Sequence, residues 1–266
     1  MSGETHVRWR CDGWQGAMAL EPGVNPGRLV AAASGPSGRA SRHAWTRALD
    51  GADGGLWLKV YPAPDGRRAW RAWRMGQALT SAGFAVPEAV LVGRRGPTGL
   101  LVTRDVGGQD LLHAVAAARG ARKRDLLRRL GRAVGDLHAA GFVHGDLVPS
   151  NVHVCGETFV LLDHDRTRRG RLLVWWGARR NLVQLGRFVV AGVTATDRVR
   201  VLCAYADRRG LSRRLRHRLA RWVAQKILAR RIAIDHVSAE VAARAGFARV
   251  MRGEVDADQA GGEPQS

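Results

Sequence analysis

Short apolar runs separated by turn residues characterise the early part of the chain. Residues 56–61 (LWLKVY) and 99–106 (GLLVTRDV) are compact hydrophobic stretches with Gly or Pro close to both ends. Such stretches are typical of buried β-strands. We therefore expect a small, mostly β lobe that extends from residue 29 to residue 106.

One helix is expected between these two strands. In residues 67–82 (RRAWRAWRMGQALTSA), Trp70, Trp73 and Leu79 recur close to the spacing of one helix face. Gly83 stands where such a helix would end. The tryptophans are expected to pack in a core, although a platform for a sugar ring is the alternative.

From residue 107 onward the pattern is mainly helical. Residues 124–140 place five apolar side chains on one face and end at Gly141, as an amphipathic helix does. These side chains are Leu126, Leu127, Leu130, Val134 and Leu137. Two apolar runs, 152–154 and 159–162, then predict a hairpin, and several helical segments follow Gly177.

The two ends of the chain lack a clear period. Residues 1–28 are rich in Gly, Pro and Trp, and we interpret them as an N-terminal extension whose tryptophans pack on the body of the protein. Residues 256–266 are polar and Gly-rich, which favours a disordered tail. The β-rich lobe at 29–106 is therefore expected to be followed by a larger helical lobe at 107–255.

Composition narrows the class of protein. Of 266 residues, 45% are hydrophobic, which is enough for one sizeable core or two small lobes. No apolar stretch approaches the roughly 18 residues of a membrane span, and the N-terminus lacks the apolar core of a signal peptide, so we expect a cytoplasmic protein. Cys11, Cys155 and Cys203 form no C-x-x-C pair, which argues against a zinc site or a disulfide framework.

Positive charge is the strongest bias in the composition. The chain has 43 Lys and Arg against 23 Asp and Glu, a formal net charge of +20, which attracts anions. Nucleic acid, an anionic membrane surface and a phosphorylated or carboxylated substrate all fit this charge. Enrichment in Arg, Ala and Gly also resembles the product of a GC-rich genome.

The basic segment at residues 208–231 is a candidate for membrane contact. Leu215, Leu219, Trp222 and Leu228 are expected on one side with arginines on the flanks, as in helices that lie on anionic membranes; a solvated helix face is the alternative. No recognised DNA- or RNA-binding motif accompanies the charge, so we do not expect a nucleic-acid partner.

The strongest signal for chemistry is VHGDLVPSNVHV (143–154) followed by VLLDHD (160–165). It combines H-x-D, an Asn five residues after that Asp, and a second Asp after the hairpin. Phosphoryl transfer explains this grouping, because Asp146 can orient an acceptor hydroxyl and receive its proton. Asn151 and Asp163 can supply oxygen ligands to a hard cation.

These motifs resemble those of the protein-kinase-like superfamily, and in particular its lipopolysaccharide-kinase branch, the Kdo and heptose kinases of the bacterial inner core. The resemblance extends over roughly residues 60–211. It includes WLKVYP, GFAVPEAVLVG, LLVTRDVGG, HGDLVPSN, LLDHDR and WWGARRNLVQLGRF, although aminoglycoside and choline phosphotransferases share the same loop. It implies an α+β, two-lobed kinase-like fold with a small β-rich N-lobe and a larger helical C-lobe.

The resemblance also implies roles for individual residues. Asp146 becomes the catalytic base, Asn151 and Asp163 the Mg²⁺ ligands, and Lys59 the strand lysine that contacts the α- and β-phosphates of ATP. For Lys59, a surface lysine with a buried stem is the alternative.

Two further segments are implied to hold the nucleotide. The hinge whose backbone meets adenine would run from Thr103 through Arg104 and Asp105 to Val106. A loop over the phosphates would contain Gly35, Ser37 and Gly38, where small residues let backbone N–H groups approach an anion.

One departure from the family pattern concerns the lysine. Family members place a Glu on the helix after the lysine strand, yet no Asp or Glu occurs between Gly66 and Pro87, and the family position falls near Ala72. Either another residue, such as Asp65 or Gln77, holds Lys59 instead, or the site is weakened.

Three residues near the motif have structural interpretations. His144 and His164 are expected to pack, with His144 also hydrogen-bonding the loop. Asp165 is expected to form a salt bridge with Arg166 that stiffens the loop, or else to contact metal or substrate.

We therefore expect an ATP- and Mg²⁺-dependent kinase that transfers the γ-phosphate to a hydroxyl of a lipid-linked, anionic sugar, in the cytoplasm or at the inner face of the cytoplasmic membrane. A kinase of a small molecule or of a protein is the alternative among enzymes. A catalytically silent nucleotide-binding scaffold is the alternative outside that class, favoured by the missing helix Glu.

Overall fold

The computed structural model describes residues 6–19, 24–34, 39–40, 43–49, 55–187 and 193–235. The chain divides into two compact units. The first comprises Met1–Gly107 and Val160–Thr167, and the second comprises Gly108–Phe159 and Arg168–Ser266. The tail expected at 256–266 and the loop expected at Gly35, Ser37 and Gly38 lie outside the described residues.

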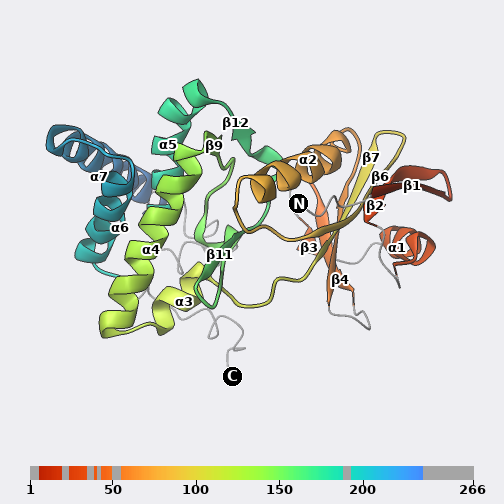
Figure 1. Cartoon of the computed structure of the whole chain (residues 1–266), viewed down its shortest axis with the longest axis horizontal. Coiled ribbons are helices and arrows are strands. Elements are labelled where there is room, and N and C mark those ends of the chain that lie inside the picture. Colours follow the sequence, from red (N-terminus) through yellow and green to blue (C-terminus); the bar gives the residue numbers. More distant parts are fainter. Residues whose placement is uncertain are drawn as a thin grey trace. The chain divides into compact units, whose positions relative to one another are not determined.

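The first unit is built on a seven-stranded antiparallel sheet with the order β1-β2-β6-β7-β5-β4-β3 (Figure 1). Its strands are β1 (His6–Cys11), β2 (Trp14–Ala19), β3 (Arg39–Ala40), β4 (Trp45–Leu49), β5 (Leu56–Tyr61), β6 (Ala89–Arg95) and β7 (Thr98–Arg104). The strands predicted at 56–61 and 99–106 are confirmed as β5 and β7, which pair with each other near the middle of the sheet.

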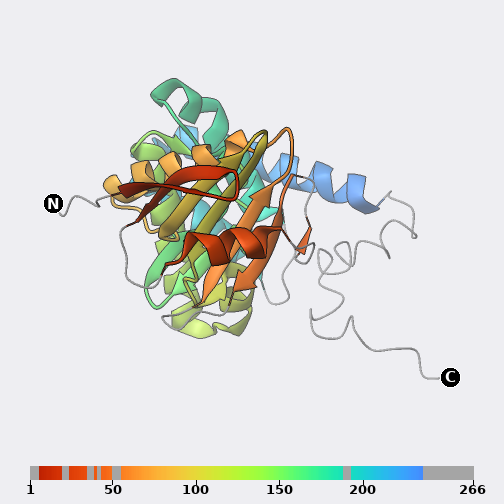
Figure 2. The ribbon, with the colours of Figure 1, turned by 90° about the vertical axis from the view of Figure 1, so that its right-hand side faces the viewer.

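Each face of this sheet is covered by one helix, α1 (Pro26–Ala33) or α2 (Arg67–Ser81). Leu58 and Val60 of β5 belong to the core that contains residues of α1, which lies across the strands in Figure 2. Tyr61 belongs to the core that contains residues of α2. Because side chains alternate along a strand, Lys59 lies on the same face as Tyr61. The predicted helix at 67–82 is confirmed, and its Trp73 is buried in this second core.

The N-terminal segment differs from the expected extension at 1–28. It supplies β1 and β2, two strands of the sheet itself, and the start of α1. Trp9 and Trp14 are buried, as expected for tryptophans that pack on the body of the protein. Gly16 permits the pairing of β2 with β6, because a Cβ at this position would lie 1.8 Å from the carbonyl oxygen of Val92.

The second unit is mainly helical. Its helices are α3 (Leu111–Ala117), α4 (Gly120–Ala139), α5 (Arg171–Gly186), α6 (Ala195–Arg208) and α7 (Arg213–Asp235). Its short strands are β8 (Gln109–Asp110), β9 (Phe142–Val143), β10 (Val152–Cys155), β11 (Thr158–Leu161, whose last two residues belong to the first unit) and β12 (Arg168–Arg169). The amphipathic helix predicted at 124–140 is confirmed within α4, and Gly141 follows it in the left-handed conformation at φ 87°.

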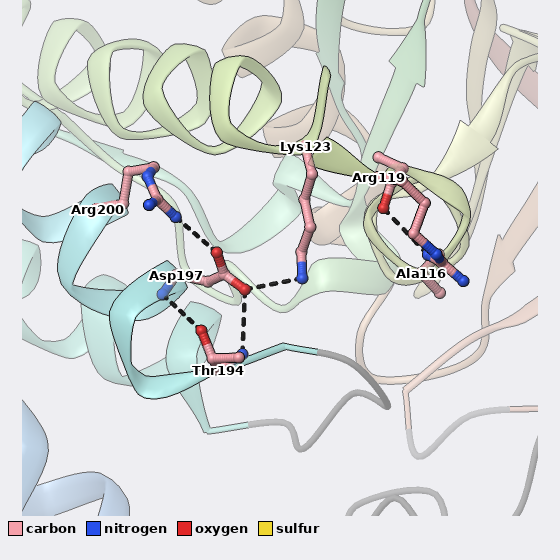
Figure 3. A network of polar contacts seen from close by, with 7 residues as sticks. Ala116, Arg119, Lys123, Thr194, Asp197 and Arg200 are labelled. Atoms are coloured by element: carbon pink, nitrogen blue, oxygen red, sulfur yellow. Dashed lines mark hydrogen bonds and ion pairs between the residues drawn. The ribbon is translucent and has the colours of Figure 1, made fainter. Parts of the chain in front are cut away.

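A polar network joins α4 to the first turn of α6 (Figure 3). The carboxylate of Asp197 forms ion pairs with Lys123 of α4 at 2.7 Å and with Arg200 at 2.6 Å. Thr194 and Asp197 also form a reciprocal capping box at the start of α6. Burial raises the pKa of Asp197, but the hydrogen bonds from Lys123 and Thr194 outweigh it and bring the pKa to about 2. This carboxylate is therefore held as a structural anion.

The basic helix α7 packs through part of the side expected to face a membrane. Val223 is buried, Leu219 and Trp222 are half-buried, and only Leu215 and Leu228 of the proposed apolar side are exposed. Leu228 is 13 residues from Leu215, so at about 100° per residue the two point to different sides of the helix. Across the described ranges, none of the helices combines the length and the apolar character needed to span a bilayer.

Candidate active site

Lys59 and Asp163 are brought together within the first unit. The Lys59 ammonium forms an ion pair with the Asp163 carboxylate and lies 5.1 Å from the centroid of the Tyr61 ring. The Lys59 side chain is 20% exposed, so its stem is largely covered while its charged end reaches the pair. Asp65, expected as a candidate partner, instead binds His43 at 2.8 Å. The partner of Lys59 is thus Asp163, and neither Asp65 nor Gln77 takes that place.

The backbone at Asp163 is unusual. Asp163 adopts φ 54° and ψ 47°, a left-handed conformation that non-glycine residues rarely occupy. It stands between the end of β11 and the short 3₁₀ helix η2 (His164–Arg166). Such outliers persist where the surrounding structure holds them, and they concentrate at functional sites. Here the conformation places the carboxylate against Lys59.

Asp165 is held by α2 rather than by its neighbour in sequence. The expected salt bridge with Arg166 is not formed, and the Arg68 guanidinium lies 3.8 Å from the Asp165 carboxylate instead. Arg68 also bonds Asp65 at 3.0 Å. Burial raises the pKa of Asp165 above its ordinary value, although the positive charges of Lys59 and Arg68 act in the opposite direction. Helix α2 therefore contributes a cation to this segment through Arg68, and Ala72 stands near the position of the family Glu.

His164 and α2 are also in direct contact. His164 is buried, as expected for a packing residue. A Cβ added at Gly76 of α2 would lie 3.0 Å from the His164 Nε2 atom. The two residues that follow Asp163 are thus both fastened to α2.

Asp146 and Asn151 are brought together within the second unit. Asn151 ends the short 3₁₀ helix η1 (Pro149–Asn151), and its side-chain N–H donates to the Asp146 carbonyl oxygen at 3.0 Å. This bond orients the amide so that its oxygen is the end available to a ligand. His144 is buried and its Nδ1 accepts from the Asp146 N–H at 3.2 Å, so it packs and hydrogen-bonds the loop as expected.

Two buried amides of α5 hold the loop that carries Asp146. Gln184 donates to Oδ1 of the Asp146 carboxylate at 3.1 Å and accepts from the Leu147 N–H at 3.2 Å. Asn181 accepts from the His144 N–H at 3.1 Å and donates to the His144 carbonyl oxygen. The two amides also bond each other at 3.0 Å. The loop is therefore fixed by side chains as well as by its own turns.

His138 of α4 extends this network into the core. Its Nε2 lies 3.1 Å from the Asn181 oxygen, and its Nδ1 lies 3.1 Å from the Tyr205 hydroxyl. Since the Asn181 oxygen only accepts, Nε2 carries the proton and Nδ1 accepts from Tyr205. Burial lowers the pKa of His138 to about 4. The imidazole is thus neutral at pH 7 and serves as a fixed support.

The expected hinge lies at the end of β7. The Arg104 N–H donates to the Glu88 carbonyl at 2.9 Å, and the Asp105 N–H donates to the Gly55 carbonyl at 2.8 Å. Arg104 also forms an ion pair with the Glu88 carboxylate at 3.1 Å.

Sequence reasoning missed the roles of Asn181, Gln184 and Arg68. The signal for the first two was a pair of amides three residues apart on the face of α5 that also carries Ala178 and Leu182, which are buried. A buried polar residue on an apolar helix face needs a partner, and such a pair can serve a neighbouring loop. Arg68 was missed because the sequence is rich in arginine, and no local pattern distinguishes the arginine that contacts a particular carboxylate.

The oxygen donors fit a magnesium ion in their chemistry. Asn151 offers an amide oxygen and Asp163 a carboxylate, the ligand types that this cation takes. Within the ranges that the structure describes, no three His, Cys, Asp or Glu side chains gather as a metal cluster. Magnesium in kinase sites uses one or two protein oxygens together with phosphate and water.

Comparison with known proteins identifies a family. The sequence model of the lipopolysaccharide kinase (Kdo/WaaP) family matches residues 60–205, more than half of the chain. The match includes Asp146, Asn151 and Asp163 and begins directly after Lys59. Among solved structures, an aminoglycoside-3'-phosphotransferase of type VIII superposes with a TM-score of 0.52 at 17% identity, covering 72% of this chain and 92% of that one. This likeness shows a protein-kinase-like fold, as expected.

Curated relatives match over shorter segments. A probable bifunctional tRNA threonylcarbamoyladenosine biosynthesis protein of Natronomonas pharaonis is 34% identical over 105 residues, 39% of this chain and 18% of that protein. An EKC/KEOPS complex subunit bud32 of Aspergillus clavatus is 72% identical over 29 residues, 11% of this chain and 10% of that protein. The matches thus span less than a fifth of these relatives' lengths.

Proposed function

Because the chain belongs to the lipopolysaccharide kinase (Kdo/WaaP) family, we propose that it transfers the γ-phosphate of ATP to a hydroxyl group of a lipid-linked, anionic sugar. Family membership and the protein-kinase-like fold make the chain a kinase. The lipid-linked sugar is proposed as acceptor on one observation. The region that matches the lipopolysaccharide kinase family contains Asp146, Asn151 and Asp163. The net charge of +20 favours an anionic acceptor.

Asp146 is assigned the role of general base. Gln184 holds Oδ1 of its carboxylate, so Oδ2 is the oxygen that we assign to the acceptor hydroxyl. In this role Asp146 aligns the hydroxyl with the phosphorus atom and takes its proton as the new bond forms. Fixing the carboxylate through Gln184 and Asn181 limits its movement, and positioning is the larger part of catalysis in phosphoryl transfer.

Lys59, Asn151 and Asp163 are assigned to the nucleotide. When bound, Mg²⁺ would neutralise charge on the phosphate oxygens. Asn151 and Asp163 would hold it through their side-chain oxygens, and Lys59 would contact the α- and β-phosphates. In the structure the charges of Lys59 and Asp163 pair with each other. When nucleotide and Mg²⁺ bind, Lys59 would pair with the phosphates and Asp163 with the metal ion, so both side chains are already in place. Gly35, Ser37 and Gly38 remain the predicted phosphate loop, and Thr103, Arg104 and Asp105 the predicted adenine contact.

A kinase of a soluble small molecule is the second candidate. It is favoured by the fold shared with the aminoglycoside-3'-phosphotransferase over 92% of that chain. A silent nucleotide-binding scaffold is favoured by the absence of an acidic residue on α2. The Lys59–Asp163 pair argues against the scaffold, because the lysine is held next to the proposed metal ligand without a helix Glu.

Phosphate transfer from radiolabelled ATP to a panel of acceptors tests the proposal. The panel contains lipopolysaccharide precursors, aminoglycosides and protein substrates, and each is assayed with and without Mg²⁺. The matched control is Asp146→Asn, which keeps the shape of the side chain and removes the base. Transfer to a lipopolysaccharide precursor that needs both Mg²⁺ and Asp146 would support the proposal. Transfer to aminoglycosides alone would establish the second candidate, and ATP binding without transfer to any acceptor would favour the scaffold.

A further inference from the structure

The first two turns of α5 expose large apolar side chains. Leu172 is 88% exposed, Trp176 is 76% exposed and Leu173 is 45% exposed. Leu172 and Trp176 are four residues apart, so they are neighbours on one strip of the helix. A cluster of this kind on a surface marks a binding site for an apolar partner more often than a single exposed leucine does.

The opposite side of α5 is already packed. Val174 and Ala178 are buried. A Cβ added at Gly177 would lie 2.4 Å from Cγ1 of Val143, so the helix is pressed against β9. This contact shows that the exposed strip is the outer face of a docked helix. The exposure of Leu172 and Trp176 is therefore a stable feature of the second unit.

Exposed arginines precede and follow this strip along the chain. Arg168 and Arg169 of β12 and Arg180 of α5 are exposed. Strand β12 leads directly into α5 (Figure 1). It pairs with β9, and Arg168 lies opposite Val143. The Arg169 guanidinium also lies 5.1 Å from the centroid of the Phe142 ring. Arg168 therefore lies just before the apolar strip and Arg180 stands one helical turn after Trp176, whereas the Arg169 guanidinium lies over a ring of β9, on the packed side of α5.

The sequence around the strip carries charge of one sign only. From Arg166 to Thr196 it contains seven arginines and no Asp, Glu or Lys. A partner with a negatively charged surface complements these arginines. The exposed Trp and Leu side chains also require an apolar layer, which must lie directly beneath that charged surface. The interface of an anionic bilayer supplies both, because its phosphates lie at the level of arginine head groups and its acyl boundary accepts Trp and Leu.

We infer that the α5 patch, formed by Leu172, Leu173, Trp176, Arg168 and Arg180, docks the protein on the surface of an anionic phospholipid bilayer. This inference goes beyond the proposed function, since it concerns the bilayer itself and holds for any acceptor. It places the contact on α5, and not on the basic helix α7 that the sequence pattern had suggested. Trp176 and Leu172 enter the acyl boundary, and the arginines contact lipid phosphates.

Sedimentation with lipid vesicles tests the inference. The protein is mixed with vesicles of phosphatidylcholine that also contain the anionic lipid phosphatidylglycerol, and with vesicles of phosphatidylcholine alone. The apolar variant is Leu172→Gln with Trp176→Gln, and the charge variant is Arg168→Gln with Arg180→Gln. Because all four side chains are exposed, thermal unfolding should be unchanged, and this is measured for each variant.

The matched control places the same apolar changes on α7. Leu215→Gln with Leu228→Gln removes two exposed leucines from the basic helix, at 43% and 58% exposure. We expect the apolar variant to lower the vesicle partition coefficient at least tenfold, the charge variant to lower it only on anionic vesicles, and the α7 variant to bind as wild type does.

Three results would overturn the inference. The first is wild-type protein that fails to bind anionic vesicles. The second is loss of binding in the α7 variant with full binding in the apolar variant, which would move the contact to α7. The third is a change of oligomeric state in the apolar variant, measured by light scattering, with vesicle binding intact, which would make the patch a protein interface. None of these readouts depends on phosphate transfer, so the failure of the proposed function would be seen separately.

Discussion

The Lys59 ammonium and the Asp163 carboxylate form an ion pair between residues 104 positions apart in the sequence. Lys59 is on β5 and Asp163 follows β11, yet both belong to the first unit. A strand lysine whose usual partner is a helix Glu thus has its counter-charge on the segment proposed to bind metal. The pair keeps the lysine near the proposed position of the phosphates.

Lys59→Met should weaken productive ATP binding and lower the rate by about 10²–10³-fold, because a positioned cation at the phosphate oxygens is removed. Nucleotide affinity and the rate of phosphate transfer are the measurements. The control is Gln77→Ala, which should behave as wild type because Asp163, and not Gln77, holds the lysine. A Lys59→Met protein that binds ATP and turns it over normally would show that the proposed phosphate contact is wrong.

Asp163→Asn should abolish Mg²⁺-dependent ATP turnover while the protein stays folded. The asparagine keeps the shape of the side chain but loses the charge that a hard cation needs. Because the side chain is 44% exposed, loss of its ion pair should change the free energy of unfolding by only ~1 kcal/mol or less. Turnover and thermal unfolding are measured together, and equal turnover in variant and wild type would contradict the metal assignment.

Asp146→Ala should retain nucleotide affinity and lose about 10³-fold or more in rate, because base and positioning roles are removed together. Gln184→Leu removes the hydrogen bond that holds the Asp146 carboxylate, and we expect a smaller loss of rate than in Asp146→Ala. A positioning role predicts that this loss falls on kcat with KM for ATP unchanged. If Asp146→Ala is as fast as the wild type, the catalytic loop has been assigned wrongly.

Arg68→Gln should destabilise the protein by about 2 kcal/mol, because the buried Asp165 carboxylate loses its cation from α2. Arg71→Gln is the control, since Arg71 is an exposed arginine on the same helix. Chemical denaturation measures both. The double variant Arg68→Gln with Asp165→Asn should recover part of the loss, and a simple sum of the two single effects would show that the residues do not interact.

The stability of the protein should fall in acid because of His138. Its pKa is lowered from 6.5 to about 4 in the folded state, so the unfolded chain binds the proton more tightly. The stabilisation is complete above pH 6.5 and is lost as the pH falls through 4. It amounts to about 3 kcal/mol, from ~1.4 kcal/mol per pKa unit.

His138→Gln should flatten this part of the profile of unfolding free energy against pH, whereas His217→Gln, at an exposed site, should leave it unchanged. A nuclear magnetic resonance titration of the wild-type imidazole gives an independent measurement. A His138 pKa near 6.5 in the folded protein would contradict the prediction.

The sequence by itself determined the elements whose signal is local. Alternation in LWLKVY, the helical spacing in residues 67–82 and 124–140, and the hairpin after residue 151 all depend on near neighbours, and the structure contains each of them. The spacing of Asp146, Asn151 and Asp163 likewise indicated phosphoryl transfer, because that chemistry requires a base and metal ligands together. The family match agrees with that indication.

Only the tertiary structure decided how residues far apart in the chain meet. Residues 6–19 were misread as an extension because Gly16 weakens the local strand signal, while its fit against Val92 is a contact across the sheet. The partner of Lys59 was likewise invisible, because three α-helices and six strands separate it from β5 in the sequence. The amides that hold the catalytic loop are 37 and 38 residues from the atoms they bind. Packing of non-local segments selects these contacts, and no local period in the sequence records them.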